Sequence, residues 1–431
     1  MSKKKQKRTK KSQSKNPQDQ NRVVVTGIGA ITPVGNTMHD SWQAFKNGQS
    51  GVVKITLIDV SHFATRIGGE IKNFDPSEYI PRKKLRHMTF ATQVAVIATE
   101  QAIADAHLDL DQEDREKIGV IIGTSSASTV DESEKATRQL IAEEARKLSP
   151  FQVLRFWPNM QSFWIAEINQ LKGYNSTVGT ACAAGTQAIG DAAMLIKSGA
   201  AEVMVAGASE YMVAETVMAG FTAMRALSTS YNDDPENAMK PFDKNREGFV
   251  PAIGGAVMIL ESEAHAKARG ANIYGEILGS GVSSDAYHMI VPDPEGKGAA
   301  LAIRRALEDA RVSVEDVDYI NAHGTATPLG DLAETKAIKS IFGDHAYNVP
   351  ISSTKSMIGH MMGATGAVEA AVCLMSIRDG IIHPTINLET PDPECDLDYV
   401  PNVPREADVE VALSNSFGLG GQNACLVLGR Y

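Results

Sequence analysis

The strongest chemical signal in the sequence surrounds one cysteine, Cys182, in the segment STVGTACAAGTQAIGDAAMLIKSG. A strand-like run gives way there to small residues and then to an apolar helical pattern. A thiol at such a junction lies near the N–H groups of a helix N-terminus, which favour thiolate and raise nucleophilicity. The flanking alanines and glycines leave room for a substrate carbonyl and for backbone donors to an oxyanion. On this segment alone, a nucleophile and a small buried apolar residue are equally well supported.

The other three cysteines show no sign of reactivity. Cys373 and Cys425 lie in apolar helix- and strand-like runs, and Cys395 lies in the loop-like PDPECDLD. Four cysteines in 431 residues do not indicate a disulfide framework, and no CxxC pair suits zinc. The sequence therefore predicts reduced thiols and a cytoplasmic setting.

Two histidines lie beside small residues that would leave their rings accessible. His323 follows a strand-like run in DYINAHGTATPLGD, and His360 lies in SSTKSMIGHMMGATGAVEA. The carboxyl end of a strand is where sites of α/β proteins gather. A histidine there can move protons or donate Nε2–H to an enolate oxygen. Taken singly, each is as well explained as a structural residue, and neither has the spacing of a metal ligand.

Lys355 lies five residues before His360 and follows a β-like SST run. A lysine drawn into such a site needs a carboxylate partner, and Glu369 is the natural candidate. The glycine-rich SNSFGLGGQNA near the C-terminus lacks the Lys-Ser/Thr pair of a phosphate-binding loop. No phosphate site is therefore expected.

Short β-branched runs alternate with helical patterns along the chain, which predicts layered α/β architecture. The strand-like runs are RVVVTGIGAITPVG, IGVIIGTSSA, AEVMVAGASE, VDYINAHGT, VPISSTKS and ACLVLGRY. Helical patterns occur in KLRHMTFATQVAVIATEQAIADAHL, after Cys182 and in LAIRRALEDARV. The runs are short and apolar, so both faces of the sheets should be covered. Because no Pro/Ser-rich linker divides the chain, we expect one unit of two packed halves.

The first 22 residues differ from the rest in charge. They hold nine Lys or Arg and one Asp, a net charge of +8, which leaves −18 for the remainder of a chain whose total is −10. We expect residues 1–21 to be a disordered, solvated tail, and we favour this over contact with nucleic acid or anionic membranes. No apolar run is long enough to span a membrane.

Placed together, these segments resemble the β-ketoacyl-[acyl carrier protein] synthases of the thiolase superfamily, and most of all the elongating type called synthase II. The resemblance runs from about Arg22 to Tyr431. It is carried, in order, by VVVTGIGAITPVGN, TACAAG, RALST, PFDKNREGF, SSDAYHM, NAHGTATPLGD, SSTKSMIGH, GATGAVE and NSFG. It implies a thiolase-like five-layer αβαβα fold of two similar halves, residues 22–270 and 271–431. It also implies assembly as a homodimer or as a heterodimer with a homologue.

The resemblance implies a decarboxylative Claisen condensation in fatty-acid chain elongation, without cofactor or metal. Cys182 would carry the acyl group, and the backbone amides of Cys182 and Phe417 would form the oxyanion hole, with Phe417 also gating access. His323 and His360 would bind the malonyl thioester and stabilise the enolate left by loss of carbon dioxide. Lys355, paired with Glu369, would orient the site.

The remaining roles implied by the resemblance concern the surroundings of the site and the acyl carrier protein. The positions that match them are the acidic Asp331 and Glu334 around the catalytic residues, Thr325 and Thr327 for the pantetheine arm, and the basic Arg82, Lys83, Arg86 and Arg225 for the carrier. An acidic body needs such a local basic patch to attract an acidic partner.

The chain departs from the family pattern in three loops. GFVPAIGGAV has Pro251, and Ile253 where an acidic residue is usual; AYHMIVPDP has Ile290 where a threonine is expected; and GLGGQN replaces GFGGTN with Leu419 and Gln422. The segment VLRFWPNMQSFWIAEINQL is also unusual. We expect these loops to surround the gate, so that the chemistry survives while acyl specificity, gating or partner choice has changed.

Other members of the superfamily fit less well. A thiolase would have a second cysteine in the late glycine-rich loop, and an initiating synthase would pair Cys and His with Asn, whereas this chain has His360. A non-catalytic partner of the chain-length-factor type lacks the nucleophilic cysteine, so the presence of Cys182 argues against that class. The runner-up is a ketosynthase of a specialised type II polyketide or polyene pathway, paired with a cysteine-less homologue. An interaction-only protein would require the altered loops to block Cys182.

Overall fold

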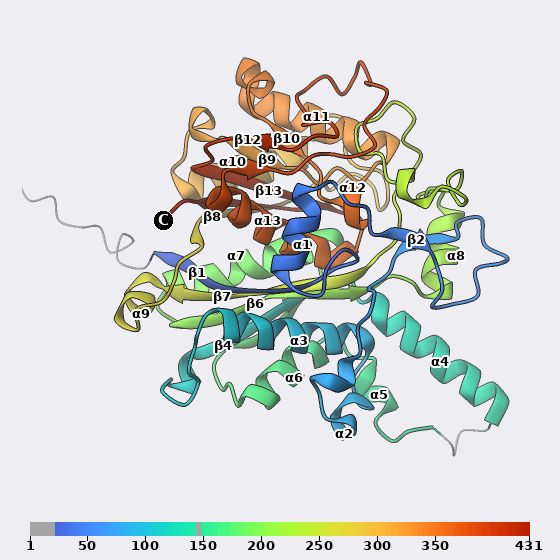
Figure 1. Ribbon diagram of the computed structural model, residues 1–431, viewed down its shortest axis with the longest axis vertical. Helices are drawn as coiled ribbons and strands as arrows, with labels where there is room; N and C mark the ends of the chain where they lie inside the picture. Colours follow the sequence, from blue (N-terminus) through green and yellow to red (C-terminus); the bar gives the residue numbers. More distant parts are fainter. Residues whose placement is uncertain (1–21, 144–147) are drawn as a thin grey trace, which may run out of the picture.

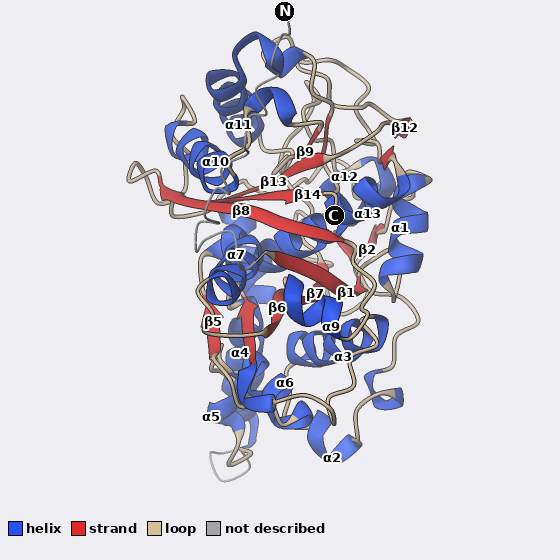
Figure 2. Cartoon of the chain, turned by 90° about the vertical axis from the view of Figure 1, so that its left-hand side faces the viewer, coloured by secondary structure: helices blue, strands red, loops and turns tan. Residues whose placement is uncertain are grey.

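The computed structural model describes residues 22–143 and 148–431, so the basic tail predicted over residues 1–21 lies outside the described residues. Figure 1 shows five layers stacked from top to bottom: helices, strands, helices, strands and helices. Figure 2 shows the strands of both halves crossing the molecule with α7 (Ala184–Lys197) between them. The expected thiolase-like five-layer α/β fold is confirmed. No helix in the described part of the chain is long and apolar enough to cross a membrane.

The strands form one ten-stranded sheet in the order β10-β9-β13-β14-β8-β1-β7-β6-β4-β5. Its two five-stranded halves meet only where β1 pairs with β8, through Val24 with Glu276 and Val25 with Gly275. The two strand layers are thus joined along one edge, and the central helices fill the space between them (Figure 1). The boundary predicted between residues 270 and 271 falls between α9 and β8 and stays a prediction.

The first half of the sheet contains the strands expected from the first three β-branched runs. Its members are β1 (Val23–Ile31), β4 (Ile118–Gly123), β5 (Asn175–Val178), β6 (Val203–Tyr211) and β7 (Ile253–Ser262). Alternate residues of β7 face opposite layers, as strand geometry requires. Met258 packs in the core around the central helices, and Val257 packs in the core under the outer helices.

The second half repeats this arrangement. Its strands are β8 (Gly275–Ser284), β9 (Tyr319–Asn321), β10 (Ile351–Ser352), β13 (Val411–Gly418) and β14 (Gln422–Gly429), and the short pairs β2 (Val52–Lys54) with β3 (Ile67–Gly69) and β11 (Ile381–Ile382) with β12 (Arg405–Glu406) lie outside it. β13 lies between β9, to which it runs parallel, and β14, to which it runs antiparallel. Residues that follow β9, β10 and β13 therefore emerge close to one another.

The central layer consists of α7 and α13 (Thr365–Asp379), which are covered by both strand layers. Residues 365–377 of α13 are all buried, which explains why this helix is apolar on every side. Small residues let the two halves approach closely. A Cβ on Gly366 would lie 2.1 Å from Thr186 Oγ1 of α7, so only glycine fits there.

The outer layers hold α3 (Phe90–Asp105) on one side and α10 (Lys297–Ala310) with α11 (Pro328–Phe342) on the other. The helical pattern predicted from Lys84 onward is broken, because Thr89 accepts a hydrogen bond from the Thr92 N–H and so begins α3 anew. The remaining helices are α1 (Met38–Lys46), α2 (Arg82–Leu85), α4 (Ala127–Glu143), α5 (Gln152–Arg155), α6 (Met160–Asn169), α8 (Glu215–Ala223), α9 (Glu263–Ala268) and α12 (Lys355–Ile358).

A charged cluster fixes α9 to the end of β7. The buried carboxylate of Glu261 binds His265 and Arg269, and His265 Nε2 lies 2.8 Å from Glu113. The hydrogen bond to Glu261 is the main reason that the pKa of His265 is raised from 6.5 to about 9. The cluster therefore holds His265 protonated at neutral pH.

Because the folded pKa of His265 is raised, its contribution to stability is complete below pH 6.5 and is lost as the pH rises to about 9. We expect the free energy of unfolding to fall by about 2 kcal/mol across that window, allowing for solvent screening. Urea unfolding at a series of pH values measures this fall. The His265→Gln variant should lack it; an equal fall in the variant would contradict the assignment.

Candidate active site

Cys182 lies where β5 leads into the central helix α7, in a single turn of 3-10 helix, η5 (Ala181–Ala183). The preceding residue, Ala181, adopts φ 47°, a left-handed conformation that a side chain rarely takes. Strained backbone of this kind persists where the surrounding structure enforces it, often at functional sites. It turns Cys182 toward a cavity between the two halves of the chain.

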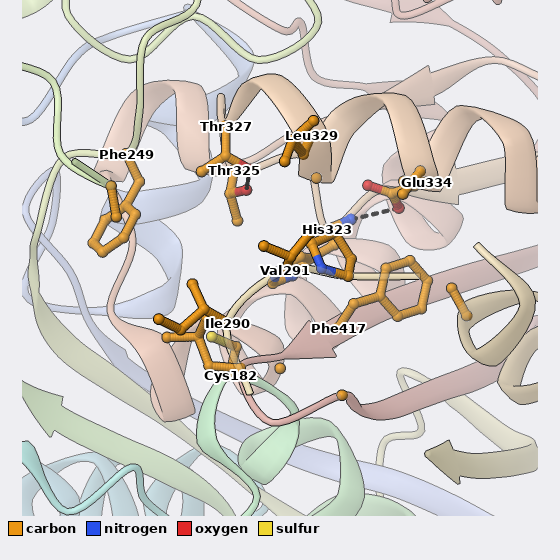
Figure 3. A pocket seen from close by; sticks show the side chains of 18 of the residues that line it. Cys182, Phe249, Ile290, Val291, His323, Thr325, Thr327, Leu329, Glu334 and Phe417 are labelled. Carbon is orange, nitrogen blue, oxygen red and sulfur yellow. Dashed lines mark hydrogen bonds between the residues drawn. The ribbon is translucent and has the colours of Figure 1, made fainter. Parts of the chain in front are cut away.

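The cavity has a volume of about 370 Å³ and is lined by both halves. Cys182 and Phe249 come from the first half, and His323, His360 and Phe417 come from the second. Figure 3 shows Cys182 at the lower end of the cavity, with His323 and Phe417 above it and Thr325 and Thr327 farther along the wall. An extended ligand arm can therefore reach the sulfur past the two threonines.

The structure brings together the three residues singled out in the sequence. His360 Nε2 lies 3.2 Å from Cys182 Sγ, and the rings of His323 and His360 are 5.5 Å apart between centroids. One atom from each of the three residues lies within 4.8 Å of the others, a spacing that a metal ion could also use. The sequence argument against metal binding considered only neighbouring positions, so it does not exclude a site that the fold assembles.

The backbone of His360 is fixed by the segment that departs from the family pattern. The His360 N–H donates to the Val250 carbonyl at 2.7 Å, and the His360 carbonyl accepts from the Ala252 N–H at 3.1 Å. Pro251 lies between these two bonds, so its missing N–H costs no hydrogen bond. The altered segment therefore adjoins a catalytic candidate, whereas we expected it to surround only the gate.

His323 follows β9 and is held through its backbone. The N–H groups of His323 and Gly324 donate to the two carboxylate oxygens of Glu334, each at 2.8 Å (Figure 3 draws the first). Its Nδ1 is buried without a hydrogen-bond partner among the described residues. Burial and then the charge of Lys355 lower the pKa of both His323 and His360 well below the usual range. Both imidazoles are therefore neutral at physiological pH.

The thiol of Cys182 differs from our expectation of a stabilised thiolate. Burial raises its pKa to about 11, and this outweighs the Leu419 N–H and the charge of Lys355, which both lower it. Only 4% of the residue is exposed, so little water can stabilise the anion. The sequence placed the cysteine at a helix start correctly but could not indicate how deeply the site is buried.

Lys355 and Glu369 form the predicted ion pair, with Lys355 Nζ 2.6 Å from Glu369 Oε1 and neither side chain exposed. Burial raises the pKa of Glu369 to about 7, against the opposing effect of Lys355. The second oxygen of Glu369 has no hydrogen-bond partner among the described residues. Removal of either member of such a buried pair would leave the other as an unpaired charge in the protein interior, which is strongly destabilising.

Asp331 and Glu334 lie on α11 and are both buried. Asp331 Oδ2 accepts from the Phe242 N–H at 2.8 Å and lies 3.8 Å from Arg246 Nε. Burial raises the pKa of Asp331 to about 7, although Arg246 opposes this. Arg246, within the quoted PFDKNREGF motif, is an ion-pair partner that the sequence reasoning did not identify.

The oxyanion-hole and gating role expected of Phe417 stays a prediction. Phe417 lies within the β13–β14 ladder opposite Asn423, and its ring packs against His323 at 5.7 Å. The Leu419 N–H, in the turn after β13, lowers the pKa of the Cys182 thiol. The sequence alone does not show that β13 ends at Gly418. It therefore could not indicate that Phe417 lies within the strand while Leu419 lies in the turn that follows. Leu419 also packs against the apolar cluster that contains Cys182, so it is a second gate candidate beside Phe417.

The other altered residues occupy three different environments. Ile290 lines the cavity and is 40% exposed (Figure 3). Ile253 is fully buried at the start of β7, in the same apolar cluster as Cys182, so no acidic group lies at that position. Gln422 is exposed and lies outside the cavity lining. Its neighbours Gly421 and Asn423 do line the cavity, so Gln422 adjoins the candidate site without lining it.

The residues expected to contact the pantetheine arm and the carrier are accessible from the cavity or the surface. Thr325 and Thr327 line the cavity, with their hydroxyl oxygens 3.0 Å apart. Arg225 is exposed at the cavity wall. The other three basic residues, Arg82, Lys83 and Arg86, are exposed at α2. Figure 1 places α2 apart from α8, which precedes Arg225, so the four do not form one compact cluster.

The buried pair Lys355–Glu369 makes a prediction about stability. Glu369→Leu alone leaves a buried, unpaired ammonium, and we expect it to lower the free energy of unfolding by about 3–5 kcal/mol. The double variant Lys355→Met/Glu369→Leu should recover most of this loss, but iodoacetamide should alkylate its Cys182 more slowly, because the charge that lowers the thiol pKa is gone. Equal losses of stability in the single and double variants would contradict the prediction.

Sequence comparisons place these residues in a known family. Residues 20–266 match the beta-ketoacyl synthase N-terminal domain, and residues 274–389 match the C-terminal domain. The chain is 47% identical over 413 residues to 3-oxoacyl-[acyl-carrier-protein] synthase 2 of Synechocystis sp., covering 96% of this chain and 99% of the relative. It is 45% identical over 410 residues to the protein of the same name from Staphylococcus aureus, covering 95% and 98%.

A solved structure agrees with these sequence matches. The ishigamide ketosynthase/chain length factor superposes with a TM-score of 0.90 at 35% identity, covering 96% of this chain and 100% of that one. The chain therefore belongs to the β-ketoacyl synthase family.

Proposed function

We propose that this protein is an acyltransferase that condenses an acyl group, held on Cys182, with a malonyl group on acyl carrier protein. The single observation that carries the proposal is the meeting of Cys182 Sγ with His360 Nε2 at 3.2 Å, beside His323, at the end of a cavity open to a ligand arm. Relatives named 3-oxoacyl-[acyl-carrier-protein] synthase 2 support this reaction, which lengthens fatty-acid chains by two carbons.

In the first stage, the sulfur of Cys182 attacks the thioester carbonyl of the carrier-bound acyl chain. A bond forms from Sγ to the acyl carbon, the bond to the pantetheine sulfur breaks, and the thiol proton ends on that departing sulfur. The Leu419 N–H and the charge of Lys355 favour negative charge on Sγ during the attack, against the effect of burial. The acyl group is then stored while the first carrier leaves.

In the second stage, malonyl carrier occupies the same cavity and loses carbon dioxide. The bond to its carboxylate carbon breaks, and the electron pair passes into an enolate that His323 and His360 stabilise by hydrogen bonding. The enolate carbon then attacks the acyl carbonyl, and the bond to Sγ breaks. Cys182 takes up one proton from solvent, which leaves a 3-ketoacyl carrier two carbons longer. Neutral imidazoles suit this step because they can donate a hydrogen bond without a bound counterion.

Acylation of the sulfur gives a direct test. Incubation with acyl carrier protein bearing a saturated chain should add one acyl mass, and peptide mapping should place it on Cys182. Cys182→Ala should show no adduct, and prior dialysis against EDTA should not change the result, because no step uses a metal. Absence of an adduct from the unaltered protein would overturn the enzyme proposal and favour an interaction-only role.

Basic residues at α2 and Arg225 are proposed to meet the acidic carrier protein. We expect the double variant Arg82→Glu/Lys83→Glu to raise KM for carrier-linked substrate about tenfold, with little change in kcat. KM for a small pantetheine thioester should be unchanged. Arg304→Glu/Arg305→Glu, a double charge reversal of the same size at two exposed residues of α10, is the matched control. Equal effects of both reversals would show that net charge, rather than this surface, attracts the carrier.

A second candidate is a ketosynthase of a specialised polyketide or polyene pathway. The structural likeness to the ishigamide ketosynthase/chain length factor and the altered residues Ile290 and Leu419 at the cavity favour it. Rates measured with carrier-linked chains of several lengths and oxidation states separate the two candidates. Preference for saturated chains throughout supports elongation, whereas preference for unsaturated or oxidised chains supports the second candidate.

We also propose that the protein works in the cytoplasm as a homodimer, or as a heterodimer with a homologue. All four cysteines are free, as expected in a reducing compartment. β5 is an edge strand of the sheet, and three large apolar side chains on and near the adjoining helices are exposed, namely Phe163, Tyr174 and Met194. An uncovered edge with apolar neighbours is suited to pairing with a second subunit.

A further inference from the structure

Thr365, at the start of α13, holds the ring of His360 from the side opposite Cys182. Thr365 Oγ1 lies 3.1 Å from His360 Nδ1, while His360 Nε2 faces the sulfur at 3.2 Å. The same oxygen accepts the Met361 N–H at 2.9 Å. Only 1% of Thr365 is exposed, so water cannot replace either partner. The hydroxyl therefore has two hydrogen-bond partners and no third among the described residues.

These contacts decide whether the Thr365 hydroxyl donates a hydrogen bond to His360 Nδ1 or accepts one from it. If the imidazole donated Nδ1–H to Oγ1, the oxygen would accept two hydrogen bonds, and its own hydrogen would be buried without an acceptor, which is unfavourable. If the hydroxyl donates to Nδ1, every group is satisfied, because Oγ1 still accepts the Met361 N–H. The second arrangement leaves Nδ1 without hydrogen and puts the single hydrogen of the neutral ring on Nε2.

The other side of the ring agrees with this assignment. The thiol of Cys182 lies 3.6 Å from Met362 Sδ, which can accept its hydrogen. The sulfur of Cys182 is then free to accept Nε2–H from His360. By contrast, Nδ1 of His323 has no partner among the described residues, so nothing comparable fixes the tautomer of that ring.

We infer that Thr365 is a positioning residue that fixes the Nε2–H tautomer of His360. The inference deepens the proposed function and rests on it, because Nε2–H is the donor that an enolate or thioester oxygen beside Cys182 requires. Loss of the Thr365 hydroxyl frees the ring to take the other tautomer, which presents a lone pair to that oxygen and repels it. A wrong tautomer leaves the geometry intact but removes the hydrogen bond.

Nitrogen-15 NMR of histidine-labelled protein tests the assignment without any substrate. The unaltered protein should show His360 with Nδ1 unprotonated and Nε2 protonated, and Thr365→Ser should keep this pattern because it keeps the hydroxyl. Thr365→Val should change the His360 signals, and the His360→Gln spectrum identifies them. A protonated Nδ1 in the unaltered protein would overturn the inference, even if the Val variant failed to fold.

The same variants show whether the tautomer of His360 affects the rate of the decarboxylation step. We expect Thr365→Val to slow release of carbon dioxide from malonyl carrier at least about tenfold, with little change in KM, and Thr365→Ser to restore it. Thr99→Val, which removes a buried hydroxyl from α3, is the matched control and should leave the rate unchanged. Equal rates for Thr365→Val and Thr99→Val would refute the inference. Failure of the unaltered protein to acylate Cys182 would instead refute the proposed function.

Discussion

The charge of Lys355 acts on every reactive group in the site. Lys355 and Glu369 are both fully buried, so their fields are weakly screened. The ammonium lowers the pKa of Cys182 against the effect of burial and adds to the burial that keeps His323 and His360 neutral. A cation at the centre of a dry site would be unstable alone, which is why Glu369, on the central helix α13, must accompany it. The ion pair thus ties the electrostatics of the site to the middle layer of the fold.

The site exists only because the two halves of the chain pack together. Cys182 comes from the strand-to-helix turn of the first half, whereas the histidines follow strands of the second. Close packing of α7 against α13 depends on small residues, as the contact of Gly366 with Thr186 shows. Where the halves meet, Cys182, His323 and His360 are buried, and the Leu419 N–H lowers the pKa of the Cys182 thiol. The fold and the chemistry therefore have one requirement in common: a buried contact between the two halves in which a few polar groups are held in fixed positions.

The sequence predicted most of the fold, because β-branched runs and small-residue turns reflect local structure. The membership of the site followed only from the resemblance to a family, because each residue taken singly was equally well explained as structural. The resemblance placed Cys182, His323, His360 and Lys355 in one site before any contact was known. The sequence missed features that depend on burial and on where a strand ends. The raised pKa of Cys182, the effect of the Leu419 N–H on that pKa, and the contact of residues 250–252 with His360 are of this kind. Thr365 carried a signal in its spacing of five residues from His360, but spacing alone does not show a hydrogen bond.

The central claim is that Cys182 carries the acyl group while the histidines serve the loss of carbon dioxide. A rapid-quench experiment separates these two tasks in the His323→Ala variant, with acyl-Cys182 followed by intact mass and carbon dioxide followed from labelled malonyl carrier. The account predicts that acyl-Cys182 forms at close to the unaltered rate while release of labelled carbon dioxide falls by a factor of about 100 or more. Release at the unaltered rate, or loss of acylation with release intact, would contradict it.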